Sequence, residues 1–169
     1  MIRPRVYCAP GEVQVVHLVD VSRLLLPIKG QPVDAESIRL AASLVRPTQG
    51  RVYALYVIKV PREYPIDADF PDEIQKGEAV LDDVEKQFRS LKCEVTAEFL
   101  QAREVGPAVI KESQERGIDL VLLGMPYRRR HGRFSLGDVV PYILEHAPCP
   151  VLVLREKMKG NPGLTAISL

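Results

Sequence analysis

A cluster of basic residues lies between two glycines in the carboxyl-terminal third of the chain. Gly124 and Gly137 bound the segment, and the residues with basic side chains are Arg128, Arg129, Arg130, His131 and Arg133. A glycine-bearing loop that leads into a helix offers backbone N–H groups and the positive end of the helix dipole to an anion. Arginine side chains can add charge-assisted hydrogen bonds to a di- or triphosphate. The alternative is that these arginines are solvated or pair with acidic residues of a partner.

Two residues at the start of the expected helix work against a phosphate in that place. The carboxylate of Asp138 is expected to accept the unpaired N–H groups itself and to repel a phosphate. Pro141 removes a further donor from the first turn.

The sequence shows no arrangement of residues for catalysis or metal binding. The three histidines, His17, His131 and His146, stand in unrelated contexts, so no catalytic residue and no metal ligand is predicted. Cys149 precedes a buried strand and is read as a packing residue.

The elements that carry the basic segment are those of a parallel sheet. Two apolar runs, from Ile118 to Gly124 and from Val151 to Leu154, read as buried strands, and residues 138–146 read as the helix between them. The loop then lies at the carboxyl ends of the strands, where open α/β sheets bind ligands.

Upstream, strands and helices alternate. Strands are expected from Arg23, from Arg51 to Val60, and from Glu94 to Gln101. Helices are expected after Asp34, which is read as the cap, from Asp72 to Leu91, and from Gly106 to Gly117. The first of these helices has an apolar face of Ile38, Ala41, Ala42 and Val45. This order predicts an α/β fold with a doubly wound parallel sheet and helices on both faces.

The chain resembles the universal stress protein family. The family signature is Gly, two residues, Gly, nine residues, Gly and then Ser or Thr, followed by a helix that ends in Ala-Pro-Cys-Pro-Val. Gly124 and Gly137 occupy the outer glycine positions, and residues 147–151 match the end. Tyr127 replaces the inner glycine and Asp138 the Ser or Thr. The resemblance implies five parallel strands in the order 3-2-1-4-5.

The resemblance also implies an adenine nucleotide, such as ATP, as ligand. In the family, the turn after the first strand carries Asp-Gly-Ser, where this chain has Lys29, Gly30 and Gln31. The candidate binding residues are Pro27, Ile28, Lys29, Gly30, Gly124, Tyr127, Arg128, Arg130, Gly137 and Asp138. Lys29 and Asp138 are expected to form an ion pair that partly fills the cleft, and Tyr127 to block it or to stack on a base.

Several functions follow from this resemblance. The first is a stress-related regulatory domain that binds a small anion, forms a homodimer through Val151 to Leu154, and catalyses no reaction. The alternatives are an interaction module with a closed cleft, a regulatory module associated with a transporter, and a weak ATP hydrolase that uses Asp138.

Composition places the chain among ordinary globular proteins. Its 169 residues include 23 basic and 22 acidic ones, a net charge of +1, so a nucleic-acid partner is not expected. Three scattered cysteines and the absence of a signal peptide or membrane-spanning run favour the cytoplasm. The expected division is an amino-terminal β extension (1–21), one family-like domain (22–156) and a loose tail (157–169).

Overall fold

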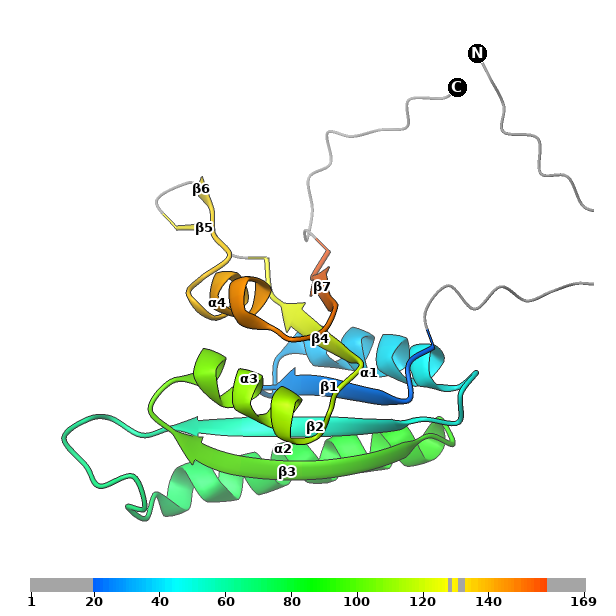
Figure 1. Ribbon diagram of the computed structural model, residues 1–169. Helices are drawn as coiled ribbons and strands as arrows, with labels where there is room; N and C mark the ends of the chain where they lie inside the picture. Colours follow the sequence, from blue (N-terminus) through cyan, green and yellow to red (C-terminus); the bar gives the residue numbers. More distant parts are fainter. Residues whose placement is uncertain (1–19, 128, 131–132, 158–169) are drawn as a thin grey trace, which may run out of the picture.

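The computed structural model describes residues 20–127, 129–130 and 133–157. Strands and helices alternate along most of this part of the chain (Figure 1). The elements are β1 (Arg23–Ile28), α1 (Pro32–Val45), β2 (Arg51–Lys59), α2 (Pro71–Ser90), β3 (Glu94–Ala102), α3 (Val105–Glu115), β4 (Leu120–Met125), β5 (Arg129–Arg130), β6 (Arg133–Phe134), α4 (Val139–His146) and β7 (Val151–Arg155).

Five of the strands form one sheet in the order β3-β2-β1-β4-β7, and all of its pairings are parallel. This is the order 3-2-1-4-5, with β7 as the fifth strand, so the predicted doubly wound sheet is confirmed. Arg23 pairs with Arg51 at the start of β1, and Val121 pairs with Val151 across β4 and β7.

The helices cover the sheet on both faces (Figure 1). On one face, Ile38 of α1 and Phe88 of α2 pack against alternate strand residues such as Leu24 and Leu26, and all four are at most 1% exposed. On the other face, Val109 of α3 and Ile143 of α4 pack against the strand residues that alternate with these, such as Leu25. The expected apolar stripe of α1 is buried, as its spacing requires.

The start of α1 differs from the prediction. The helix begins at Pro32 with Gln31 as the N-cap, so Asp34 is the third helical residue rather than the cap. Proline is well suited to a first helical position because its missing N–H would have no partner within the helix. Asp34 reaches back to the cap instead, in the manner of a capping box.

The segment between β4 and α4 contains a short antiparallel hairpin that was not predicted. Arg129 pairs with Phe134 and Arg130 with Arg133. The hairpin projects from the end of the molecule at which β4 finishes (Figure 1).

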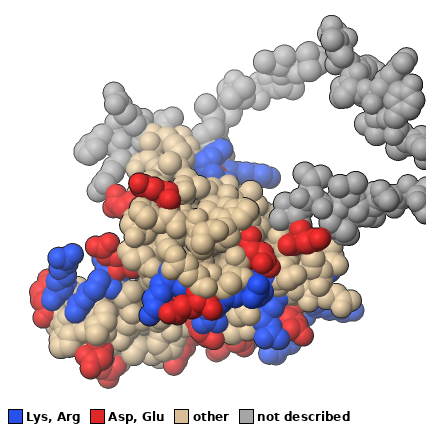
Figure 2. Space-filling view, viewed as in Figure 1, with Lys and Arg blue, Asp and Glu red and all other residues tan. Residues whose placement is uncertain are grey.

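The two ends of the chain lie mostly outside the described residues, so the amino-terminal β extension and the loose tail stay predictions. No helix in the described part of the chain is long and apolar enough to cross a membrane. Basic and acidic side chains are interspersed on the face shown in Figure 2, as expected for a net charge of +1.

Candidate ligand cleft

The sheet opens between its two central strands. β1 and β4 are neighbours, but their register contains only the pairs Leu24–Leu120 and Leu25–Val121, near their amino ends. On its other side, β1 pairs with β2 over its whole length, as far as Ile28. Pro27 has no N–H to contribute to either ladder. The carboxyl ends of β1 and β4 are therefore not bridged, at the point where strand order reverses and ligands of such folds bind.

The turn after β1 forms one side of this opening. Gly30 has a φ of 71°, a left-handed conformation that a glycine adopts without strain. A β-carbon at Gly30 would also lie 2.8 Å from Cγ2 of Val80 on α2. The turn thus needs glycine for both reasons, and it leaves the neighbouring Lys29 exposed.

Asp34 accepts hydrogen bonds from the backbone of this turn. Its Oδ2 accepts hydrogen bonds from the backbone N–H of Gln31 at 2.8 Å and from that of Lys29 at 3.2 Å. Only 9% of Asp34 is exposed. Burial raises the pKa of the Asp34 carboxyl, and the backbone N–H groups of Gln31, Lys29 and Gly30 oppose that rise in pKa. The chain therefore places its own carboxylate on N–H groups that could otherwise bind an external anion.

The first signature glycine, Gly124, is a packing residue. A β-carbon there would lie 2.5 Å from Oγ of Ser37 and 3.4 Å from Cγ1 of Val33, both on α1. Ser37 is only 1% exposed, and its hydroxyl donates to the carbonyl of Val33 at 3.0 Å. Gly124 thus allows α1 to lie close against β4.

Tyr127, at the position of the inner signature glycine, packs against the hairpin and β7. Its ring stacks on that of Phe134, with centroids 5.7 Å apart, and the Arg155 guanidinium lies 5.2 Å from its centroid. Phe134 and Arg155 were not among the predicted site residues. Their role depends on the unpredicted hairpin and on β7 lying beside β4.

The start of α4 follows the hairpin and lies at the same end of the molecule as the carboxyl end of β4 (Figure 1). Gly137 has a φ of 70°, and its amide donates to the Ser135 hydroxyl at 3.2 Å. Asp138 is the N-cap, but its exposed side chain makes no capping hydrogen bond. The expectation that this carboxylate occupies the N–H groups at the helix start is therefore wrong.

The predicted ion pair between Lys29 and Asp138 is not formed either. Within the described residues, none of the ion pairs shorter than 4.0 Å includes either side chain. Both groups point into solvent, so no salt bridge between them closes the cleft.

The structure thus brings most of the predicted residues to one end of the sheet. Pro27 and Ile28 end β1, and Lys29 and Gly30 form the turn after it. Gly124 is the last residue but one of β4, and Tyr127 lies two residues after the strand. Gly137 and Asp138 lead into α4 at the same end of the molecule (Figure 1). Arg128 and the side chain of Arg130 fall outside what the structure describes.

The described residues hold no group of three or more His, Cys, Asp or Glu side chains arranged for a metal ion. His146 stacks on Tyr142, and its Nδ1 lies 2.8 Å from the Tyr142 carbonyl oxygen, away from the cleft. Burial raises the pKa of the Cys93 and Cys149 thiols, which lowers their thiolate fraction.

Comparison with known proteins agrees with this geometry. The model of the universal stress protein family matches residues 21–155. A universal stress protein of Methanocaldococcus jannaschii is 23% identical over 143 residues, which are 81% of this chain and 84% of that protein.

Solved structures that share the fold include two with a bound nucleotide. The universal stress protein of Archaeoglobus fulgidus in complex with dAMP has a TM-score of 0.62 at 15% identity, over 80% of this chain and 98% of its own. A family member from Arabidopsis thaliana with AMP bound has a TM-score of 0.59 at 16% identity, over 80% and 92% of the two chains. With the family model covering most of its length, the chain belongs to the universal stress protein family.

Proposed function

We propose that the chain is a regulatory, stress-related domain that binds an adenine nucleotide, or another small anion, in the cleft between the β1–α1 turn and the start of α4. Two relatives of the same fold have AMP or dAMP bound. The proposed contacts are those predicted from the sequence: Pro27, Ile28, Lys29, Gly30, Gly124, Tyr127, Arg128, Arg130, Gly137 and Asp138.

The observation that carries the proposal is the exposed Lys29 ammonium beside the unbridged ends of β1 and β4. Neither Lys29 nor Asp138 is used in an ion pair within the described residues. A phosphate at the cleft would gain a charge-assisted contact from Lys29. The exposed Asp138 carboxylate at the start of α4 would repel that phosphate, so we place the phosphate on the Lys29 side.

Tyr127 favours a second candidate, an interaction module that binds no nucleotide. Its ring stacks on Phe134 beneath Arg155, where a family member with the full signature has a glycine. An aromatic ring there limits close approach of a phosphate to the backbone. Such a module could act on a protein partner, including a transporter.

A weak ATP hydrolase is the candidate from a different class. Hydrolysis would require a carboxylate near the phosphates to hold a metal ion, and Asp138 is the residue available. A magnesium-dependent turnover that is lost in Asp138→Ala would favour this function over simple binding.

Calorimetric titration of nucleotide-stripped protein with AMP and with ATP plus magnesium tests the proposal. The unaltered protein is expected to bind, and Lys29→Met to bind at least tenfold more weakly. The comparison variant carries Lys29→Asp, Tyr127→Gly and Asp138→Ser, which restores the family signature. Binding by this triple variant alone would mean that the three native residues have closed the cleft, and would favour the interaction module.

We further propose a cytoplasmic homodimer joined through β7. The strand is at an edge of the sheet, and its Leu152 is 39% exposed. An apolar edge strand is a pairing site unless another element covers it. The described cysteines, Cys93 and Cys149, are free thiols, as a reducing compartment favours.

A further inference from the structure

The other edge of the sheet is also open. β3 ends the strand order, and in the described part of the chain its nine residues, Glu94 to Ala102, pair on one side only, with β2. An edge strand presents a row of backbone N–H and C=O groups to any chain that can align with it. Proline and lysine, which commonly protect such edges, are absent from β3.

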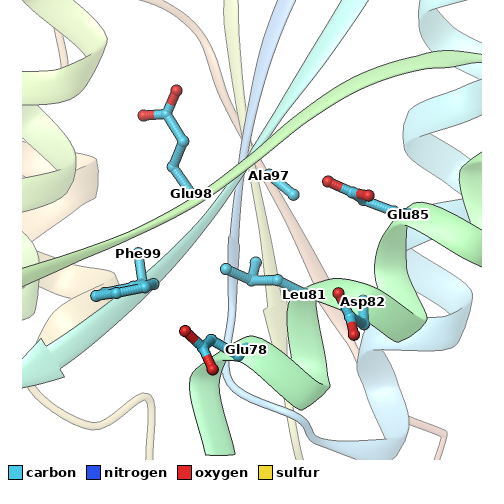
Figure 3. A pocket seen from close by; sticks show the side chains of 7 residues that line it. All are labelled: Glu78, Leu81, Asp82, Glu85, Ala97, Glu98 and Phe99. Atoms are coloured by element: carbon cyan, nitrogen blue, oxygen red, sulfur yellow. The ribbon is translucent and has the colours of Figure 1, made fainter. Parts of the chain in front are cut away.

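A hollow lies along this edge, between β3 and α2. Its volume is about 400 Å³, and its apolar part consists of Leu81, Ala97 and Phe99. Phe99 is 39% exposed although it is a large aromatic residue, and Leu81 of α2 is nearly buried beside it. Figure 3 shows these side chains between the β3 ribbon and the helix.

Three carboxylates line the α2 side of the hollow. Glu78, Asp82 and Glu85 are spaced by four and three residues, so they form one stripe along the helix (Figure 3). None of the cations that the structure describes lies within 4.0 Å of their carboxylate oxygens. The like charges repel one another, and a cation between them would relieve that repulsion.

The fourth carboxylate, Glu98, is already used on the opposite face of β3. It accepts a hydrogen bond from Nη2 of Arg116 at 2.6 Å, and Arg116 also binds Glu112 at 2.7 Å. In Figure 3 the Glu98 side chain extends to the other side of the β3 ribbon from Glu78 and Asp82. The unsatisfied negative charge is therefore confined to the side of the edge that faces α2.

We propose that this hollow is a docking groove for an extended, basic segment of a partner protein, which adds a strand to β3. Backbone hydrogen bonds to β3 would supply affinity, as in other strand-addition complexes. Alternate side chains of the added strand would face α2, and lysine or arginine there would meet Glu78, Asp82 and Glu85 while their aliphatic stems cover Leu81 and Phe99.

The negative charge of the docking groove excludes a nucleotide from it. A nucleotide phosphate would be repelled by three carboxylates, and the groove is separated from the cleft by the full width of β2, since β2 lies between β3 and β1. Docking at the groove is therefore independent of nucleotide binding, and either property can fail without the other.

The test uses the full chain and two synthetic peptides of nine residues, in which either Lys or Glu alternates with Val. Peptide is titrated into isotope-labelled protein while amide shifts and hydrogen exchange are followed by NMR. The Lys peptide is expected to shift the amides of β3 and to protect those that face away from β2, with affinity that falls as salt rises. The Glu peptide is expected not to bind.

Two triple variants that remove the same net charge distinguish the effect of the groove carboxylates from the effect of overall charge. Glu78→Gln/Asp82→Asn/Glu85→Gln is expected to weaken binding of the Lys peptide at least tenfold. Glu36→Gln/Asp67→Asn/Glu145→Gln removes the same charge from α1, the loop after β2 and α4, and is expected to leave binding within twofold of the unaltered protein.

Several results would overturn the docking groove. Equal weakening by both triple variants would show attraction by overall charge only. Binding without protection of β3 amides would show that no strand is added. Strong protection, in the protein alone, of the β3 amides that face away from β2 would mean that another segment of the chain covers the edge. If that protection rises with protein concentration, a second copy covers it.

Discussion

At the scale of single residues, the turn after β1 buries an acidic side chain, Asp34, and exposes a basic one, Lys29. The Asp34 carboxylate is buried on backbone N–H groups of the turn, whereas the Lys29 ammonium, five residues earlier, is exposed. An anion that approached this turn would therefore meet the lysine rather than the Asp34 carboxylate. The N–H groups of the turn are also satisfied without any external ligand, because the Asp34 side chain accepts their hydrogen bonds.

The buried carboxylate predicts a pH dependence of stability. The pKa of Asp34 is raised in the folded state, chiefly by burial, so its favourable contribution is present below the unfolded pKa of about 4 and is lost as pH rises through the folded pKa. Asp34→Asn cannot titrate but keeps an acceptor for the turn. Urea unfolding of both proteins from pH 4 to 7 should therefore show the free energy of unfolding of the unaltered protein falling relative to that of Asp34→Asn.

The opposite trend would show that the hydrogen bonds of Gln31 and Lys29 to the carboxylate outweigh its burial and lower the pKa. Asp34→Ala serves as a control for the turn itself. It leaves both N–H groups without their acceptor and is expected to cost about 1–2 kcal/mol at either pH.

At the scale of elements, two glycines near the proposed ligand site allow helices to pack closely on β4 and on the β1–α1 turn. Gly124 lies against Val33 and Ser37 of α1, and the turn at Gly30 lies against Val80 of α2. The glycines of this region thus set distances between elements. Proximity to a phosphate is not needed to explain either of them.

This packing predicts the cost of a methyl group at the first signature position. Gly124→Ala places a β-carbon 2.5 Å from Oγ of Ser37, so it is expected to lower the free energy of unfolding by about 1–3 kcal/mol. In a Ser37→Ala background, the same substitution should cost clearly less, because the obstructing oxygen is gone. Chemical denaturation of the four proteins of this double-mutant cycle measures the difference.

Equal costs of Gly124→Ala in the two backgrounds would place the strain elsewhere, for instance against Val33. Gly137→Ala is a useful contrast. Its β-carbon would meet nothing within 4 Å, so its cost comes from the positive φ alone, roughly 1 kcal/mol.

At the scale of the whole molecule, the two edges of the parallel sheet, β7 and β3, have no further strand beside them within the described residues, and their chemistry differs. The β7 edge exposes Leu152 and belongs to the strand through which we propose dimerisation. The β3 edge is bordered by Glu78, Asp82 and Glu85, which oppose pairing with an acidic or purely apolar strand. The two edges could therefore engage different partners at the same time.

The β7 edge predicts the assembly state. The unaltered chain is expected to elute at the mass of a dimer in size-exclusion chromatography with light scattering, at micromolar concentration. Leu152→Glu should shift it to the monomer, because a carboxylate on each copy would be buried opposite a like charge. The far-UV circular dichroism spectrum should stay unchanged, since Leu152 is 39% exposed in the single chain.

A monomeric unaltered protein would contradict the β7 interface outright. Leu144→Glu provides the matched control, because this leucine is also exposed, at 51%, but lies on α4. It should leave the dimer intact.

The sequence by itself determined the fold. Continuous apolar runs at Leu24–Leu26 and Leu120–Leu123, and helical stripes such as Ile38, Ala41, Ala42 and Val45, are local patterns, and burial of both sheet faces requires them. The strand order came from the resemblance carried by Gly124, Gly137 and the Ala-Pro-Cys-Pro-Val turn. These features are read within one element or one motif, so the sequence is sufficient for them.

Only the tertiary structure determines which charged side chains pair and where the groove between α2 and β3 lies. Lys29 and Asp138 were expected to pair, yet both are exposed and make no ion pair within the described chain. The sequence predicts Asp34 as the cap of α1, whereas Gln31 is the N-cap. The sequence also does not show that the carboxylates of α2 lie beside the β3 edge. Each of these depends on a few ångströms between side chains from separate elements, a distance that helix and strand periodicity do not encode.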